Sequence, residues 1–248
     1  MLVLLPPSET KRAGGRAARL DLGSLALPAL RPQRETVLDA LEALSTDAAK
    51  AVRVLRLGVS QHHEIAVNAA VRSAPTMSAV DRYTGVLYDA LDAASLDTAA
   101  RRWLGAHVLI HSAPFGPVRA LDRIPAYRLG AGVALPGAPL RRVWAGAVTD
   151  AIAEAAPRFV LDLRSEAYVA LGPMPASVDS VYVRVVSEGS DGEVRALNHF
   201  NKQAKGALVR TLAIRRARIG STRALHRWAD AHGLRVRSGG PGEVALYA

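Results

Sequence analysis

The chain contains no cysteine and few aromatic residues. Phe, Trp and Tyr together make up 5% of its 248 residues, and the cysteine count is zero. Without thiols there is no disulfide, no thiolate nucleophile and no cysteine metal site. With so few aromatic side chains, we expect no platform on which the bases of a single strand stack.

Long apolar runs are absent too, although half of the residues are hydrophobic. No run reaches the roughly 18 apolar residues that a transmembrane helix needs. The first residues lack the basic segment ahead of an apolar stretch that marks a signal peptide. No internal repeat, low-complexity tract or evident linker divides the chain. We therefore expect a cytoplasmic protein with no membrane partner, folded as a single domain over residues 1–248.

Familiar catalytic and metal-binding motifs are missing. The sequence has no Walker loop, no G-x-S-x-G elbow and no complete dinucleotide fingerprint. His62-His63-Glu64 begins like the helix of a zinc metalloprotease, but Val67 stands where the second histidine would be. The seven histidines form no recognisable ligand set. We therefore expect no metal, no cofactor and no direct handling of iron.

Acidic residues are scarce in the last quarter of the chain. The formal net charge is +10, and residues 195–248 hold 11 Lys or Arg against two acidic residues, or +9. The preceding residues are nearly neutral, with 21 basic and 20 acidic side chains. Codon bias explains why arginine replaces lysine, but not why the acids are missing. A basic segment of this kind indicates a polyanionic partner, nucleic acid first.

Short apolar runs alternate with amphipathic stretches along the chain. Residues 2–5, 107–112 and 159–163 have the length and composition of buried strands. Asp191-Gly192 marks a hairpin between two further strands. Apolar residues at helical spacing predict helices over residues 32–44, 46–57, 64–72, 80–91, 95–105, 139–156, 201–218 and 221–232. The pattern predicts a mixed α/β (α+β) fold with a central mixed sheet flanked by helices.

Each of the three apolar strands runs into polar chemistry. The first is followed by Pro6-Pro7 and then Ser8-Glu9-Thr10-Lys11, the second by the loop after Ser112, and the third by Arg164-Ser165-Glu166. If the strands are neighbours in the sheet, these clusters converge at the edge where ligands commonly bind. The competing interpretation of the first cluster is a capped turn with solvated charges.

The loop over residues 112–129 carries Arg119, Tyr127 and Arg128 among prolines and glycines. Such a loop can hold guanidinium groups in fixed positions for a phosphate or carboxylate. Alternatively, Asp122 pairs with an arginine of the same loop and Tyr127 packs in the core.

Lys202 and Lys205 are three residues apart, so they share a face near the start of a predicted helix. Gly206 beside them permits close backbone approach. Two ammonium groups at a helix N-terminus suit an anion. A solvated helix face is the alternative.

Several of these segments together resemble a known family. They are Leu4-Leu5-Pro6-Pro7-Ser8-Glu9-Thr10-Lys11, Tyr83-Thr84-Gly85, Tyr127-Arg128-Leu129, Ser165-Glu166-Ala167-Tyr168, and Asn201-Lys202 with Lys205-Gly206. In this order they are similar to the YaaA family of bacterial peroxide-stress proteins. The resemblance implies a mixed α/β fold with a positively charged cleft and a helix-hairpin-helix-like element. It also implies DNA binding and a role in limiting oxidative damage by restraining free iron.

Two functional hypotheses follow. The first is a stress-response protein that binds duplex DNA through phosphate contacts with low sequence specificity. Its candidate contacts are Ser8, Thr10, Lys11, Arg119, Tyr127, Arg128, Ser165, Tyr168, Lys202, Lys205 and Gly206. The second is an enzyme acting on a nucleotide or another small anionic substrate. Glu9 or Glu166 would then act as general base, while Lys11 and Arg128 hold the anion.

Overall fold

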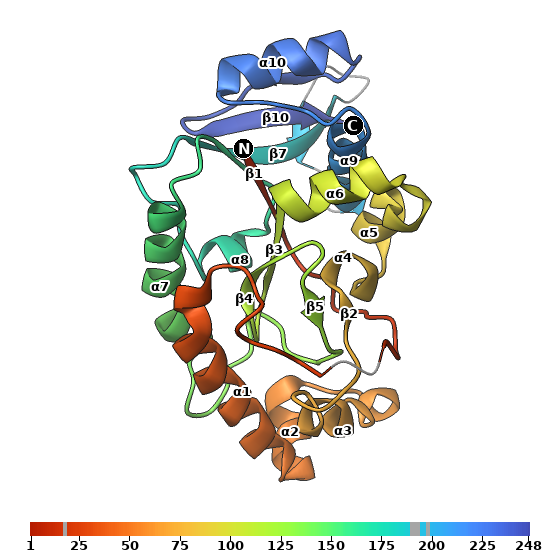
Figure 1. Cartoon of the computed structure of the whole chain (residues 1–248), viewed down its shortest axis with the longest axis vertical. Coiled ribbons are helices and arrows are strands. Elements are labelled where there is room, and N and C mark those ends of the chain that lie inside the picture. The colour runs from red at the N-terminus through yellow and green to blue at the C-terminus, as the bar shows by residue number, and fades with distance from the viewer. Residues whose placement is uncertain (17–18, 189–193, 197–198) are drawn as a thin grey trace.

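A twisted mixed sheet runs through the middle of the molecule, with helices on both faces (Figure 1). The computed structural model describes residues 1–16, 19–188, 194–196 and 199–248. Seven strands follow the order β4-β3-β1-β6-β7-β10-β9, and β8 pairs with β7 outside this path. The strands of this sheet are β1 (Leu2–Leu5), β3 (Val108–Ser112), β4 (Gly116–Arg119), β6 (Val160–Asp162), β7 (Ser180–Glu188), β8 (Val194–Ala196), β9 (Val236–Ser238) and β10 (Glu243–Tyr247).

The centre of the sheet is parallel. Strand β1 lies between β3 and β6, with Val3 in register with Val108 on one side and Leu161 on the other. Strands β7 and β10 continue the parallel set, whereas β4 and β9 run antiparallel at the edges. Val3, Leu4 and Leu5 are almost completely buried. A continuous apolar run is what a strand covered on both faces requires, so the predicted mixed α/β fold is confirmed.

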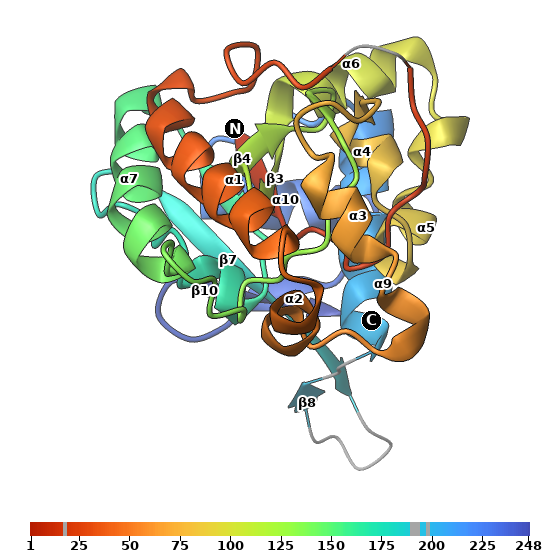
Figure 2. The ribbon, with the colours of Figure 1, turned by 90° about the horizontal axis from the view of Figure 1, so that it is seen from below.

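Helices cover the two faces of the sheet. The helices are α1 (Arg31–Ser45), α2 (Ala48–Leu55), α3 (Glu64–Ala69), α4 (Ala79–Arg82), α5 (Val86–Leu91), α6 (Thr98–His107), α7 (Leu140–Ala155), α8 (Glu166–Val169), α9 (His199–Ile214) and α10 (Thr222–Ala231). Helices α1 and α7 lie on one side of the sheet and α5, α6 and α9 on the other (Figure 2). Short 3-10 turns lie at Pro28–Leu30, Val59–Gln61 and Ala93–Ser95, and a small separate ladder pairs β2 (Met77–Ser78) with β5 (Arg123–Ile124).

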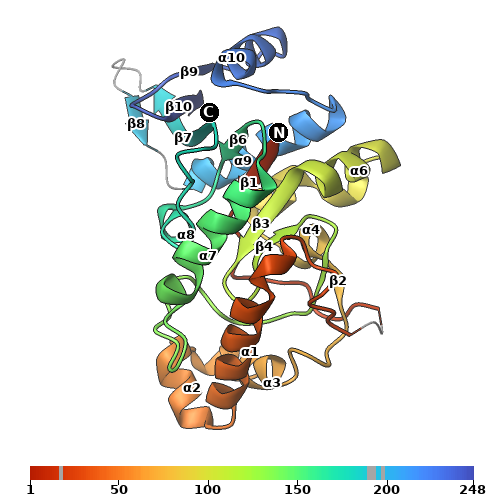
Figure 3. The same ribbon diagram turned by 60° about the vertical axis from the view of Figure 1, so that its left-hand side comes forward.

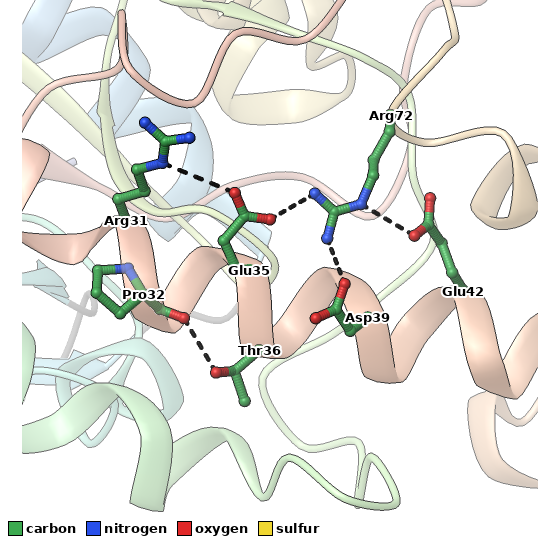
Figure 4. A network of polar contacts seen from close by, with 7 residues as sticks. All are labelled: Arg31, Pro32, Glu35, Thr36, Asp39, Glu42 and Arg72. Atoms are coloured by element: carbon green, nitrogen blue, oxygen red, sulfur yellow. Dashed lines mark hydrogen bonds and ion pairs between the residues drawn. The ribbon is translucent and has the colours of Figure 1, made fainter.

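Helix α1 shows why the helical spacing was a reliable signal. Its residues Val37, Leu38, Leu41 and Leu44 are buried on one face. On its other side, the guanidinium of Arg72 contacts three carboxylates of the helix (Figure 4). Its Nη1 lies 2.6 Å from Glu35, its Nη2 2.5 Å from Asp39 and its Nε 3.0 Å from Glu42. This network ties α1 to the segment after α3, at the end of the molecule farthest from α10 (Figure 3).

The second predicted helix begins two residues later than expected. Its N-cap is Asp47 rather than Thr46, with which the predicted range 46–57 starts, and the Asp47 carboxylate accepts a hydrogen bond from the Lys50 N–H at 2.9 Å. Thr46 instead donates its hydroxyl to the Ala43 carbonyl, at the end of α1. An aspartate and a threonine are both good caps, so composition alone did not decide between them.

The predicted helix over residues 80–91 is interrupted. Helix α4 ends before Tyr83, and α5 starts after Gly85, whose φ of 94° is outside the helical range. The stretch after Phe115 also differs, because β4 forms a strand antiparallel to β3 where a loop was expected. The turn of the predicted hairpin at Asp191-Gly192 lies outside the described residues.

Three arginines are completely buried and stabilise the backbone: Arg34, Arg82 and Arg164. Arg82 donates to carbonyls on both sides of its own segment, including those of Gly14 at 3.0 Å and Ile124 at 3.2 Å. These side chains count toward the formal charge but are not available to a polyanion. Among the described residues, no helix combines the length and the apolar character that crossing a membrane requires.

Candidate functional site

Two adjoining cavities lie at the carboxyl ends of β1 and β6. The first cavity has a volume of about 410 Å³ and the second about 810 Å³. They share the walls formed by Pro7, Ser8 and Glu9 and by Ser165, Ala167 and Tyr168. We call the two together the strand-end cleft. Its place at the carboxyl ends of parallel strands is typical of ligand sites in α/β proteins.

The predicted convergence of strand ends occurs for the first and third clusters. Strands β3, β1 and β6 are neighbours, so the segments after Leu5 and Asp162 meet. The middle cluster behaves differently, because Ser112 is buried and accepts a hydrogen bond from the Phe115 N–H at 3.1 Å. The chain therefore turns back into the core there, and it reaches the cleft only from Arg128 onward, through residues 128–133.

Lys11 fixes the shape of the turn after β1. Its ammonium donates to the carbonyls of Ser8 at 3.0 Å and Glu9 at 3.1 Å, and it lies 4.1 Å from the centre of the Tyr127 ring. Thr10 adds a hydrogen bond from its hydroxyl to the Thr84 carbonyl at 3.3 Å. The polar cluster is thus an ordered wall of the first cavity.

The environment of Lys11 favours its neutral form. Burial lowers the pKa of its amine to about 7, while the charge of Glu64 acts in the opposite direction and that of Arg128 in the same direction. Near neutral pH both protonation states are therefore populated. In its charged form this amine can bind an anion, and because it titrates near pH 7 it can also transfer a proton to or from a ligand.

Arg128 is held in place by a buried asparagine. The Asn68 amide donates to the Arg128 carbonyl at 2.9 Å, and its oxygen accepts from the Arg128 N–H at 2.7 Å. The guanidinium then reaches the exposed carboxylate of Glu9 at 3.2 Å. Asn68 was not singled out in the sequence, because a single asparagine in a helix carries no distinctive pattern.

The second cavity contains a buried ammonium group. Lys205 is 4% exposed and lies over the Tyr182 ring, with Nζ 5.3 Å from its centre. Burial lowers its pKa to about 8, Asp162 raises it and Arg184 lowers it. Lys202, on the same helix, lines the cavity from an exposed position.

Arg184 on β7 is a wall residue that sequence reasoning missed. Its guanidinium holds the Glu243 carboxylate through bonds of 3.0 and 2.7 Å and lies 3.7 Å from Glu166. The signal was present in the alternation along β7, where Val183 and Val185 are buried and Arg184 faces the other way.

A buried ion pair supports the floor of the cleft. Arg164 donates two hydrogen bonds to Asp162, at 2.9 and 2.7 Å, and a third contact of 2.9 Å joins it to Nδ1 of His111. Burial and the adjacent guanidinium hold the pKa of His111 well below its usual range. This network orients the segment that carries Ser165, and its own side chains do not line either cavity.

Most of the predicted site residues line the strand-end cleft. They are Ser8, Glu9, Thr10, Lys11, Arg128, Ser165, Glu166, Tyr168, Lys202 and Lys205. Tyr127 is 1% exposed and packs beneath Lys11, with its hydroxyl 2.7 Å from that of Tyr83. The packing alternative for Tyr127 is therefore the one observed.

Arg119 and Gly206 lie outside the cleft. Arg119 is exposed on β4, where its guanidinium lies 3.3 Å from the Ala106 carbonyl. Asp122 accepts hydrogen bonds from the backbone N–H groups of Arg119 and Ala26 rather than from an arginine side chain. A Cβ on Gly206 would lie 2.1 Å from the Leu87 carbonyl oxygen, so this glycine allows α9 to pack closely on α5.

The basic last quarter is divided by the fold. Of its described residues, only Asn201, Lys202 and Lys205 line the cleft. The exposed arginines of α10 belong to a helix that packs against the edge strand β9. Gly220, just before α10, packs against Arg158. Arg158 lies just before β6, so α10 begins near the amino ends of the parallel strands, whereas the cleft lies at their carboxyl ends. The charges of α10 and of the cleft are therefore separate features of the surface.

Comparisons with known proteins are consistent with this arrangement. The chain is 48% identical over 220 residues to a UPF0246 protein of Corynebacterium efficiens, covering 86% of this chain and 85% of the relative. A UPF0246 protein of Streptomyces coelicolor is 45% identical over 217 residues, covering 86% and 82%. One from Corynebacterium glutamicum is 40% identical over 241 residues, covering 95% and 94%.

A family model described as peroxide stress protein YaaA matches residues 1–238. The match spans every element that forms the cleft, from β1 to the start of α9. It supports a role in the response to peroxide stress, in agreement with the motifs quoted from the sequence. The chain belongs to the YaaA family of peroxide stress proteins.

Proposed function

We propose that the protein acts under peroxide stress by binding DNA through phosphate contacts in the strand-end cleft. One observation carries this proposal: cationic side chains from separate parts of the chain meet there. They are Lys11, Arg56, Arg128, Arg184, Lys202 and Lys205. Phosphates dominate the affinity of proteins for DNA, and arginine and lysine are their usual partners.

The surroundings of these cations suit phosphate better than base recognition. Hydroxyl groups of Ser8, Thr10 and Ser165 lie on the same walls and can donate to phosphate oxygens. Arg128 is paired with Glu9, whose side chain is 81% exposed and able to swing away when a phosphate takes its place. Contacts of this kind give little sequence specificity. Any effect on iron is then indirect, through protection of DNA from iron-dependent damage.

The proposal separates two groups of basic residues. Replacing Arg128 and Lys202 with alanine removes two cleft cations, while the double variant of Arg223 and Arg227 removes two exposed charges of α10. In gel-shift titrations with duplexes of unrelated sequence, the cleft variant should bind at least tenfold more weakly to all of them. Wild-type affinity in the cleft variant, or an equal loss in the α10 variant, would contradict the proposal.

The pKa of Lys11, which burial lowers to about 7, favours a second function, that of an enzyme. An amine that titrates near neutral pH is able to transfer a proton, and Glu9 lies in the same turn. The cleft would then act on a nucleotide or other small anionic substrate, with Glu9 or Glu166 as general base and Arg128 holding the anion. Incubation with a panel of nucleotides, followed by chromatography, tests this. Turnover lost in Glu9→Gln or Glu166→Gln supports it, and no turnover of any nucleotide contradicts it.

A further inference from the structure

The second cavity contains a charged group without a hydrogen-bond partner in the described structure. Lys205 is 4% exposed, lines the cavity and makes no hydrogen bond to any described residue. The charge of Asp162 raises the pKa of Lys205, but Asp162 is itself held by Arg164 through two hydrogen bonds. An ammonium that lines a cavity without a hydrogen-bond partner is free to donate to an anionic ligand.

The same cavity is lined by the first turns of a long helix. Helix α9 has 16 residues, and Asn201, Lys202 and Lys205 face the cavity from its beginning. The N-terminal end of a helix carries partial positive charge, which favours an anionic group. The first turns of the helix and the buried lysine thus line the same cavity.

The remaining walls suit an organic group attached to that anion. Tyr88, Tyr168 and Tyr182 line the cavity beside the hydroxyls of Ser8 and Ser165. Its volume of about 810 Å³ is within the range of small-molecule sites. A nucleotide fits a cavity of this size.

We propose that the second cavity binds one phosphomonoester group, held by Lys205 and the first turn of α9, with its nucleoside along the tyrosine walls. The inference rests on the proposed function in taking the cleft as a phosphate site, but it does not require duplex DNA. A phosphomonoester has two sources, a free nucleotide and the phosphorylated end of a DNA strand. Both present the same dianion.

Binding should depend on pH in a bell-shaped manner. The phosphate becomes a dianion above about pH 6, and Lys205, with a pKa of about 8, loses its proton above that value. Asp162 and Glu166 favour the charged form of Lys205 and Arg184 opposes it, while Glu9, Lys202 and the hydroxyl-bearing Tyr182 line the same cavity. Affinity should therefore be highest between about pH 6 and 8 and fall on either side.

Calorimetric titration with adenosine 5′-monophosphate tests the site directly, with inorganic phosphate and adenosine as partial ligands. Lys205→Met keeps an unbranched side chain one atom shorter and removes the charge, and it should lower the affinity for the monophosphate at least tenfold. Lys50→Met is the matched control, because Lys50 is an exposed lysine on α2 that lines neither cavity. Its affinity should stay within twofold of wild type. Absence of binding to the wild type, or equal binding by Lys205→Met, would overturn the inference.

The exposed residue Lys202 provides a second test that does not depend on folding of the core variant. Lys202→Met should lower the affinity for the monophosphate about threefold, and an unchanged affinity would count against the inference. Short duplexes with 5′-phosphate or 5′-hydroxyl ends distinguish the two sources of the ligand. Monophosphate binding without duplex binding supports this site and contradicts the proposed DNA function. Duplex binding without any preference for a phosphorylated end, and without monophosphate binding, supports the proposed DNA function and contradicts this site.

Discussion

At the scale of single residues, two of the four lysines lie in one cleft, Lys205 buried and Lys11 half-buried. Burial lowers the pKa of Lys11 to about 7 and that of Lys205 to about 8. Ionisable groups with pKa values shifted this far by desolvation are typical of functional sites. Lys11 also donates hydrogen bonds to two backbone carbonyls of its own turn, so it orders this wall of the cleft in addition to carrying a charge there.

The lowered pKa of Lys11 predicts how stability varies with pH. Between pH 7 and its unfolded value of 10.5, the unfolded state binds a proton at this site that the folded state does not. The free energy of unfolding therefore gains a rising contribution across this window, at most about 1.4 kcal/mol per pH unit. Urea unfolding at pH 7, 8 and 9 should show a smaller rise for Lys11→Met than for wild type. Identical slopes would indicate that Lys11 stays protonated in the folded protein.

Single residues were also where the sequence was least informative. Ser8, Lys11 and Ser165 were found because they follow apolar strands, and that signal depends only on neighbours in the chain. Asn68 and Arg184 act on the cleft through contacts with residues 60 and 59 positions away, respectively. No local pattern encodes such partners. Tyr127, conversely, was predicted near the ligand, but it lies under Lys11 in the core.

At the scale of elements, the break between α4 and α5 shapes the cleft. Gly85 has a φ of 94°, and a Cβ there would lie 3.4 Å from the hydroxyl oxygens of both Ser8 and Thr10. The strong helical pattern over residues 80–91 concealed this break, because the periodicity continues across it. The close approach of the two segments needs a residue that adopts positive φ without strain.

Gly85→Ala should destabilise the protein by about 1–3 kcal/mol, because alanine is strained in this backbone conformation. Thermal or urea unfolding measures the loss. Gly146→Ala is the matched control, since Gly146 lies within α7 with open space around its Cβ position. That substitution should raise stability by about 0.5–1 kcal/mol. Equal effects of the two substitutions would contradict the role assigned to Gly85.

The attachment of α1 depends on Arg72, which joins three carboxylates of that helix. Arg72→Ala removes the partner that Glu35, Asp39 and Glu42 share, and these carboxylates at neighbouring helical positions then repel one another. The expected loss is about 1 kcal/mol, and it should shrink as salt is added. Arg31→Ala is the control, because its one ion pair is long, at 3.8 Å, and its side chain is 64% exposed. A loss in Arg31→Ala equal to that in Arg72→Ala would show that the network adds nothing.

At the scale of the whole molecule, the net charge of +10 is not one continuous surface. Arg34, Arg82 and Arg164 are buried on backbone or carboxylate partners, and α10 lies at the edge of the sheet away from the cleft. Composition predicted a polyanionic partner for the last quarter of the chain. The fold assigns only the beginning of α9 to the cleft, because the direction of that helix carries the later arginines away.

The architecture itself was largely predictable, since three buried strands with polar carboxyl ends define a parallel sheet edge. The edge strand β4 was not, because its two central residues, Pro117 and Val118, carry no alternating pattern. Its pairing with β3 depends on long-range register rather than on local propensity. The cleft was thus predicted from strand ends, whereas its far wall on β7 required the folded chain.

The salt dependence of duplex binding tests the central claim most directly, namely that the cleft contacts the phosphates. With about six phosphates neutralised, one for each cationic side chain of the cleft, log affinity should fall against log salt with a slope of roughly −0.9 per phosphate. Fluorescence anisotropy should show that removing Arg128 and Lys202 makes this slope shallower by about two phosphates, whereas removing Arg223 and Arg227 leaves it unchanged. A slope altered only by the α10 variant, or binding that does not depend on salt, would contradict the account.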